Sequence, residues 1–192
     1  MLNDSQLALI MRRISPARRA AYLQPLNAAM QERGITTLAR VSAFLGQIGH
    51  ESGELVWMEE IWGPNDAQRR YEPPTTLAQR LGNTQKGDGF RYKGRGPIQI
   101  TGRDNYARFG AMLGVDLVGQ PALAATPGLA FAIAGLYWRT NGLNELADAR
   151  QFVAITRRIN GGTNGLADRQ MYYERAKSVF AADPPAVRAA PQ

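Results

Sequence analysis

A long, nearly uninterrupted apolar segment over residues 127–138 limits the possible folds of this chain more than any other feature. Thr126 and Pro127 can begin a helix there, and Asn141-Gly142 can end it. A helix that is apolar on almost every side must lie inside a core and be covered by other elements. The sequence therefore predicts a domain built around this helix, to which we assign no chemistry.

The flanking segments have apolar residues at three- and four-residue steps, which is the spacing of amphipathic helices. Asn3 or Asp4 can cap a first short helix, and Ser15-Pro16 can begin a second helix that runs toward Gly34. We therefore expect a mainly α fold. The face of the second helix that contains Ala20 should pack inward. Further helices are expected over about residues 37–52, 76–81, 104–112 and 166–181, and one helix or a pair of helices over residues 143–159. Asp104 can cap the helix over residues 104–112.

The length and composition are those of one compact domain. With 192 residues, 44% of them hydrophobic, the chain can bury a real core but is short for two full domains. We expect a single domain over residues 1–182, with its cleft between two lobes, and a flexible tail over residues 183–192. The chain has no cysteine, which excludes disulfides and thiolate chemistry.

The net charge of +7 and the pI near 10.1 predict attraction to a polyanion. Nucleic acid, an anionic membrane surface and the acidic polymers of a bacterial cell wall all have that charge. Arg12, Arg13, Arg18 and Arg19 form a basic patch that is either a solvated face or a contact for such a polymer. No known nucleic-acid-binding element is present, which disfavours nucleic acid.

Acidic residues concentrate in residues 46–62, against the trend of the whole chain. The segment contains the only histidine, His50, and two of the three tryptophans, Trp57 and Trp62. Its simplest interpretation is a solvated acidic surface whose tryptophans pack into a core. Either tryptophan can also stack on a sugar ring. The four carboxylates are those of Glu51, Glu54, Glu59 and Glu60.

Helix geometry favours a second interpretation of the acidic segment. Glu51 falls in the last turn of the helix expected over residues 37–52, and Gly53 can end that helix. If the helix continued, Glu60 would lie about 180° around it and roughly 13 Å further along. A reversal at Gly53 lets Glu60 face Glu51 across a cleft instead. Glycosidic bond hydrolysis requires such a pair, one carboxyl kept protonated by a raised pKa and the other ionised to activate water.

Residues 92–106 carry the next strong pattern, after a long irregular span over residues 63–93 that we interpret as functional. The run Ile98-Gln99-Ile100-Thr101 alternates apolar and polar residues, which predicts a short strand or extended segment with Gln99 and Thr101 on one side. Glycines on either side allow close approach to the backbone. The sequence lacks the Gly-Lys-Ser/Thr ending of a nucleotide-binding loop.

Three stretches together resemble glycoside hydrolase family 19, and more closely its bacterial and phage branch, which includes endolysins. The first is His50-Glu51-Ser52-Gly53 with Glu59-Glu60. The second is residues 94–106, Gly-Arg-Gly-Pro-Ile-Gln-Ile-Thr-Gly-Arg-Asp-Asn-Tyr. The third is residues 155–162, Ile-Thr-Arg-Arg-Ile-Asn-Gly-Gly, with Leu-Ala-Asp-Arg at 166–169. The similarity covers about residues 38–178, in the order of the family.

The resemblance implies a lysozyme-like, two-lobed helical domain with a short extended element at its cleft. It also implies inverting hydrolysis of β-1,4 bonds between N-acetylated sugars. Glu51 matches the general acid, Glu60 the general base, and Thr101 a hydroxyl that holds the attacking water. Arg169 matches an arginine that can pair with a catalytic carboxylate. The other expected substrate-binding residues are His50, Trp57, Gln99, Asn105, Tyr106 and Asn160.

Some assignments stay open at this point. Glu59 competes with Glu60 for the role of base, whereas Glu54 and Glu59 can also be simple exposed charges. His50 can have a structural hydrogen-bonding role, and Asn160 can be only a turn residue at a helix end. Asp104 stands where plant chitinases of the family have a tyrosine, which leaves the substrate undecided.

The sequence therefore favours a peptidoglycan hydrolase of endolysin type, because its basic charge suits an anionic wall better than neutral chitin. Alternatives are a chitinase, a non-catalytic wall-binding relative and, least, a nucleic-acid-binding protein. We expect a monomer without metal or cofactor and without stable membrane insertion. The absence of a signal peptide in this sequence suggests synthesis in a host cytoplasm and holin-type release to the cell wall.

Overall fold

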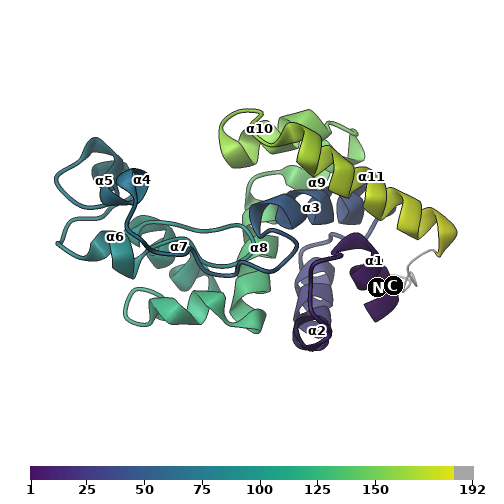
Figure 1. The fold of residues 1–192 in the computed structure, drawn as a ribbon, viewed down its shortest axis with the longest axis horizontal. Helices are drawn as coiled ribbons and strands as arrows, with labels where there is room; N and C mark the ends of the chain where they lie inside the picture. The colour runs from purple at the N-terminus through teal and green to yellow at the C-terminus, as the bar shows by residue number, and fades with distance from the viewer. Residues whose placement is uncertain (184–192) are drawn as a thin grey trace.

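The structure, a computed structural model, describes residues 1–183 and is mainly helical (Figure 1). The tail expected over residues 183–192 thus lies, apart from Asp183, outside the described residues. The elements are α1 (Asp4–Ile10), α2 (Pro16–Glu32), α3 (Leu38–Glu51), α4 (Asp66–Arg69), α5 (Thr76–Arg80), α6 (Asp88–Arg91), α7 (Arg103–Leu113), the 3₁₀ helix η1 (Pro121–Ala125), α8 (Pro127–Thr140), α9 (Leu143–Asp148), α10 (Phe152–Asn160) and α11 (Leu166–Ala182).

The helices form two lobes of unequal size (Figure 1). The smaller lobe contains α4, α5, α6 and α7 at one end of the molecule. The larger lobe contains α1, α2, α3, α9, α10 and α11. Within it α3 packs against α11, and α2 packs against α8, the helix between the lobes. Within residues 1–183, no helix is both long and apolar enough to cross a membrane.

Helix α8 joins the lobes because its two faces belong to two different apolar clusters. Phe131 and Trp138 are fully buried in the cluster of the large lobe, where Trp138 meets Phe44 edge to face at 5.2 Å. Ile133 and Leu136 lie in the cluster of the small lobe. Burying each large apolar side chain stabilises the fold by about 1.5–3 kcal/mol. The prediction of a central core helix over this segment is confirmed.

Helix α3 begins and ends as the sequence predicts. The Thr37 hydroxyl accepts a hydrogen bond from the Arg40 N–H at 3.3 Å and caps the first turn. After Glu51, three consecutive residues adopt left-handed backbone conformations, with φ of 56° at Gly53, 65° at Glu54 and 62° at Leu55. Such a run cannot continue a right-handed helix. The chain therefore turns away after Ser52, as the interpretation of the acidic segment requires.

Residues 98–101, expected to form a short strand or extended segment at the cleft, lie at the cleft but form no strand. β pairing within residues 1–183 is limited to two isolated bridges, Glu59 with Arg95 and Arg95 with Ile100. Gln99 has a left-handed φ of 56°, which breaks the alternation of side chains along a strand. This extended element is therefore a tight loop closed by single bridges.

Several smaller expectations are also wrong. The irregular span contains two one-turn helices, α4 and α6, which are too short to produce a periodic pattern. Gly102, and not Asp104, precedes α7 as its cap residue. Glu54 is buried and not exposed, because it accepts hydrogen bonds from the Arg13 N–H and, at 3.2 Å, from Arg175. On α2, Ala20 is exposed although we expected it to face the core.

Candidate active site

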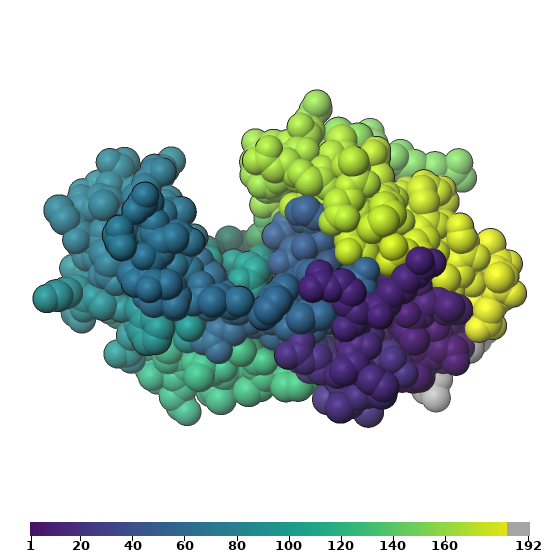
Figure 2. All heavy atoms as spheres, in the orientation of Figure 1, coloured from purple at the N-terminus to yellow at the C-terminus, as the bar shows by residue number. Residues whose placement is uncertain are grey.

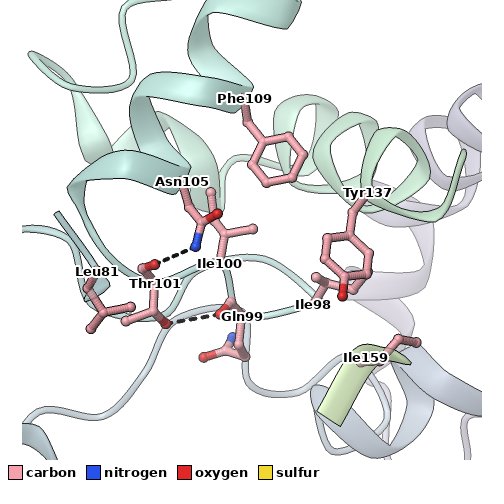
Figure 3. A pocket seen from close by; sticks show the side chains of 9 residues that line it. All are labelled: Leu81, Ile98, Gln99, Ile100, Thr101, Asn105, Phe109, Tyr137 and Ile159. Atoms are coloured by element: carbon pink, nitrogen blue, oxygen red, sulfur yellow. Dashed lines mark hydrogen bonds between the residues drawn. The ribbon is translucent and has the colours of Figure 1, made fainter. Parts of the chain in front are cut away.

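A cleft separates the two lobes. Figure 2 shows the molecule hollowed between the small lobe and the α10–α11 region of the large lobe. At this boundary lies a cavity of about 270 Å³. Ile98 and Tyr137 line it and also pack against both apolar clusters, so the floor of the cavity is the junction of the lobes. The other lining residues are Leu81, Gln99, Ile100, Thr101, Asn105, Phe109 and Ile159 (Figure 3).

Three of the predicted site residues meet in this cavity (Figure 3). The Thr101 hydroxyl donates to the Gln99 carbonyl at 3.0 Å, and the Asn105 amide donates to the Thr101 carbonyl at 2.8 Å. The Gln99 amide donates to the Gly96 carbonyl at 2.7 Å. These bonds tie the 98–101 loop to α7 and hold the Thr101 hydroxyl at the cavity with free acceptor capacity.

Glu51 projects from the last turn of α3 into a network of buried polar groups. Its carboxylate accepts a 2.5 Å hydrogen bond from Arg169, whose side chain is only 2% exposed. Arg169 also donates to Gln47 at 2.7 Å, and Gln47 donates to the Thr156 hydroxyl at 2.8 Å. The contact between Arg169 and a candidate catalytic carboxylate is therefore present as expected. A buried arginine behind Glu51 has no surface for substrate, so its place among the substrate-binding residues is corrected.

Tyr137 connects Glu51 with the cavity. Burial and then the nearby charge of Glu51 raise the pKa of Tyr137 above its ordinary value, while Arg108 and Arg158 act in the opposite direction. Glu51 therefore acts electrostatically on a residue that shares the cavity with Thr101, although neither Glu51 nor Glu60 is among the residues that line this cavity. Sequence reasoning missed Tyr137 because it assigned no chemistry to α8. The available clue was a side chain with a polar tip in an otherwise apolar helix.

Glu60 lies beyond the reversal and is held by the small lobe. One carboxylate oxygen accepts from the Gly94 N–H at 2.9 Å, and the other accepts from the Gln68 amide at 2.9 Å. The Glu60 N–H in turn donates to the Gly94 carbonyl at 2.8 Å. The pKa of Tyr71 is raised, first by burial and then by the negative charge of Glu60. Both donors to Glu60 are neutral, and together they fix the orientation of its carboxylate.

Glu59 has different surroundings from its neighbour Glu60. Its side chain is 44% exposed and forms ion pairs with Arg95 at 3.0 Å and Lys93 at 3.3 Å. The backbone of Glu59 also makes the isolated bridge to Arg95. These contacts give Glu59 a structural role in the small lobe and favour Glu60 as the candidate base.

Tyr106 was expected to bind substrate, but it is fully buried. Its hydroxyl donates to the Lys93 carbonyl at 2.7 Å and accepts from Arg95 at 2.8 Å. Burial raises the pKa of Tyr106 to about 12, although the Arg95 hydrogen bond and charge act against the shift. Tyr106 therefore supports the loop that carries Gly94 and Arg95 and does not reach the cleft.

The remaining predicted residues lie near the reversal and α11. His50 contacts Asp168 through Nδ1 at 2.7 Å, which fits the structural alternative, and its substrate-binding role stays a prediction. Trp57 is 47% exposed and covers Gly53, where an added Cβ would come within 2.7 Å of its ring. The Asn160 amide donates to the Asn164 carbonyl at 3.0 Å and closes the turn before α11. Substrate contacts of Trp57 and Asn160 also stay predictions.

The described residues offer no evident metal site. Within residues 1–183, no group of three or more His, Cys, Asp or Glu side chains is placed to hold a metal ion. The chemistry available at the cleft is that of carboxylates, amides, hydroxyls and the arginine beside Glu51.

A two-lobed helical domain with a carboxylate beside the cleft between its lobes is the arrangement of lysozyme-like glycoside hydrolases. The family model described as chitinase class I, of glycoside hydrolase family 19, matches residues 27–177. The chain therefore belongs to glycoside hydrolase family 19. It is a glycoside hydrolase related to chitinases.

Known relatives span bacteria and plants. A family 19 domain-containing protein of Haemophilus influenzae is 34% identical over 84% of this chain and 90% of its own length. An endochitinase of Arabidopsis thaliana is 36% identical over 75% of this chain, but the match spans only 47% of the plant protein. Among solved structures, a bacterial family 19 chitinase aligns with a TM-score of 0.73 at 23% identity, covering 96% of this chain and 97% of its own. Chitinase C of Streptomyces griseus aligns with a TM-score of 0.73 at 21% identity, covering 93% and 92%.

Proposed function

We propose that this protein hydrolyses the β-1,4 bonds of peptidoglycan glycan strands by an inverting mechanism, with Glu51 as general acid and Glu60 as general base. One observation carries the proposal. The two carboxylates on either side of the left-handed residues 53–55 are each fixed by hydrogen bonds from a different lobe. Arg169 holds Glu51 on the large lobe, and Gly94 with Gln68 holds Glu60 on the small lobe.

Glu51 would donate its proton to the leaving glycosidic oxygen. The guanidinium of Arg169 then stabilises the carboxylate that remains, and it keeps the side chain in one rotamer while the bond breaks. Because Arg169 is itself anchored by Gln47, the acid is supported by a chain of buried hydrogen bonds across α3, α10 and α11. Such support gives a preorganised donor.

Glu60 would take a proton from the water that attacks the anomeric carbon. A carboxylate has about four acceptor positions, so the bonds from Gly94 and Gln68 leave room for this water. The Thr101 hydroxyl, which donates to Gln99, can accept a hydrogen bond from the same water. Inversion requires the two carboxyls to stand about 6.5–9.5 Å apart with the water between them.

The net charge of +7 supports peptidoglycan as the substrate, because wall polymers are anionic and chitin is neutral. Chitin is the second candidate, since the plant relatives are named endochitinases. The place of action would be the bacterial cell wall. Membership of the endolysin branch, holin-type release and a monomeric state belong to the same proposal.

The test compares the wild type with Glu51→Gln, Glu60→Gln and Glu59→Gln on purified peptidoglycan and on chitin oligosaccharides. New reducing ends are identified by mass spectrometry. We expect kcat to fall by about 10²–10⁴-fold in the first two variants, the usual contribution of a general acid or base. Glu59→Gln is the matched control and should keep most of its activity. Cleavage of chitin alone would overturn peptidoglycan as the proposed substrate. An inactive Glu59→Gln together with an active Glu60→Gln would overturn the assignment of Glu60 as the general base.

A further inference from the structure

Arg108 lies on α7 next to Phe109, a residue that lines the cavity. Arg108 is exposed, and its guanidinium lies 5.3 Å from the centre of the Phe109 ring. Phe109 lines the cavity and packs against Tyr137 with ring centres 6.4 Å apart. A cation thus stands beside the aromatic wall of the cleft (Figure 3 shows the two rings).

Arg158 approaches the same wall from α10, on the other lobe. Its carbonyl accepts a hydrogen bond from the Tyr137 hydroxyl at 3.3 Å. Its guanidinium is exposed and donates one N–H to the Asn141 carbonyl at 2.9 Å, which leaves its other N–H groups for a ligand. The Arg158 backbone thus contacts Tyr137 from the large lobe, and the Arg108 guanidinium contacts Phe109 on the small lobe.

Neither cation is neutralised by the protein itself as far as the structure describes it. Among residues 1–183, no carboxylate lies within 4.0 Å of either guanidinium, whereas Arg40, Arg95, Arg103 and Arg169 all have carboxylate partners. Both charges also reach the Tyr137 hydroxyl, where they act to lower its pKa. Within residues 1–183, other exposed arginines such as Arg12 and Arg150 also form no ion pair, so Arg108 and Arg158 are distinguished by their position next to residues that line the cavity.

We propose that Arg108 and Arg158 bind a carboxylate on the side arm of the glycan strand and so select peptidoglycan over neutral glycans. This inference rests on the proposed function. Every second sugar of peptidoglycan carries a lactyl ether, which ends either in its own carboxylate or in a stem peptide with carboxylates. An arginine guanidinium matches a carboxylate with two parallel N–H bonds. Chitin presents no such group.

The experiment measures kcat/KM on four forms of glycan strand for the wild type and for Arg108→Gln/Arg158→Gln. The strands either keep their stem peptides or have lost them to an amidase. Each kind is used with native carboxylates and after conversion of the carboxylates to amides with carbodiimide and ammonia. The matched control, Arg12→Gln/Arg150→Gln, removes the same charge from two exposed arginines that do not line the cavity.

For the wild type and the control variant, amidation should lower kcat/KM by about five- to tenfold, the size expected for two partly exposed charge pairs. In Arg108→Gln/Arg158→Gln, kcat/KM on native strands should fall by the same factor. Amidation should then lower kcat/KM much less than in the control variant, which has the same net charge and so the same general attraction to the strand. An effect confined to peptide-free strands assigns the lactyl carboxylate, and one confined to peptide-bearing strands assigns the stem peptide.

The proposal is overturned if amidation lowers kcat/KM equally in the wild type and in the double variant, or if it has no effect on the wild type. A loss in the double variant that is equal on native and amidated strands also overturns it, because that pattern indicates only a damaged fold. If the wild type cleaves none of the four strands, the proposed function itself fails, which is a different result.

Discussion

Glu51 and Glu60 have the same side chain but are held by different kinds of donor. Glu51 receives a hydrogen bond from a buried cation, whereas Glu60 receives bonds from a backbone N–H and a neutral amide. Under the proposed mechanism, Arg169 would stabilise the carboxylate that forms when Glu51 gives up its proton. The two neutral donors would orient Glu60 toward the attacking water. The assignment of Glu51 as acid and Glu60 as base rests on the family resemblance and not on these donors.

Arg169→Lys should separate positioning from substrate binding. Lysine keeps the positive charge but loses the fork that reaches both Glu51 and Gln47. We expect kcat to fall by about 10–100-fold with KM nearly unchanged, because the arginine is buried away from the substrate. Steady-state kinetics would measure both constants, and a melting curve would verify folding. A rise in KM at constant kcat would instead show that Arg169 contacts the sugar.

Tyr106→Phe tests the corrected role of Tyr106 as a buried support. Loss of the hydroxyl leaves the Lys93 carbonyl and an Arg95 N–H without this partner, which should cost about 1–3 kcal/mol of stability. KM should not change, since the residue is fully buried. Denaturant unfolding and kinetics on the same preparation measure the two effects. An altered KM at unchanged stability would return Tyr106 to the substrate-binding residues.

The same variant gives a pH dependence with a definite sign. The pKa of Tyr106 is raised to about 12 in the folded protein, above the ordinary value near 10. The folded state therefore holds this proton more tightly, and the contribution is complete below pH 10 and lost as the pH rises toward 12. Wild-type stability should fall across that window, and Tyr106→Phe should reduce the slope. The pKa of Tyr172 is also raised to about 12, mainly by burial, so Tyr172 should account for the slope of stability against pH that remains in the variant.

Residue positions were predictable where one local pattern decides them. Glu51 falls at a helix end because the apolar spacing stops there and glycine follows. Glu54 was not predictable in this way, because its burial depends on Arg175, which lies 121 positions away in the sequence. Tyr137 was not predictable as a site residue, because the apolar pattern of its helix indicates burial but does not show which residue faces a cavity at the edge of the core.

At the scale of elements, α6 and α7 are joined by one ion pair. Asp88 is buried and accepts from Arg103 at 2.6 Å and 3.0 Å, as well as from the N–H groups of Thr84 and Gln85. Burial alone would raise the pKa of Asp88, but these hydrogen bonds outweigh it and lower the pKa below its ordinary value. The bonds fix the irregular span against the helix that carries Asn105.

Asp88→Asn should make the molecule less stable at neutral pH and less sensitive to acid. The ionised Asp88 stabilises the fold at every pH above the unfolded value of about 3.9, and this contribution is lost as the pH falls through the lower folded value. We expect a deficit of about 2–3 kcal/mol at pH 7 that shrinks below pH 4. Denaturant unfolding at pH 7, 5, 4 and 3 measures it. Asp66→Asn, an exposed carboxylate, is the control and should show little deficit.

Helices were predictable from the sequence to the extent that they are long enough to repeat an apolar spacing. α3, α8 and α11 satisfy this condition, and their ends lie close to the expected residues. The one-turn helices α4 and α6 contain too few residues for any period. The alternation over residues 98–101 predicted a strand or extended segment but not the tight turn that is present. Alternation in four residues says nothing of φ, and Gln99 adopts a left-handed conformation that the pattern does not encode.

At the scale of the whole molecule, α8 is the element that makes a cleft possible. Each lobe packs its own apolar cluster on a different face of this helix, so the lobes meet at α8 and leave a hollow between them (Figure 2). The sequence indicated a central helix but not this division, because the clusters assemble from contacts between distant segments. The cavity lies where Ile98 and Tyr137 belong to both clusters.

The net charge of the molecule predicts how salt affects its activity. A charge of +7 attracts an anionic strand over a distance set by the Debye length, which is about 30 Å at 0.01 M salt and about 10 Å at 0.1 M. We expect kcat/KM on peptidoglycan strands to fall by about tenfold between 0.01 M and 0.3 M salt, mainly through KM. On neutral chitin oligosaccharides the change should be less than about twofold, because no substrate charge is screened. Initial rates with both substrates across a salt series measure this difference. An equal response of the two substrates would mean that salt acts on the enzyme alone and that its charge does not draw in the strand.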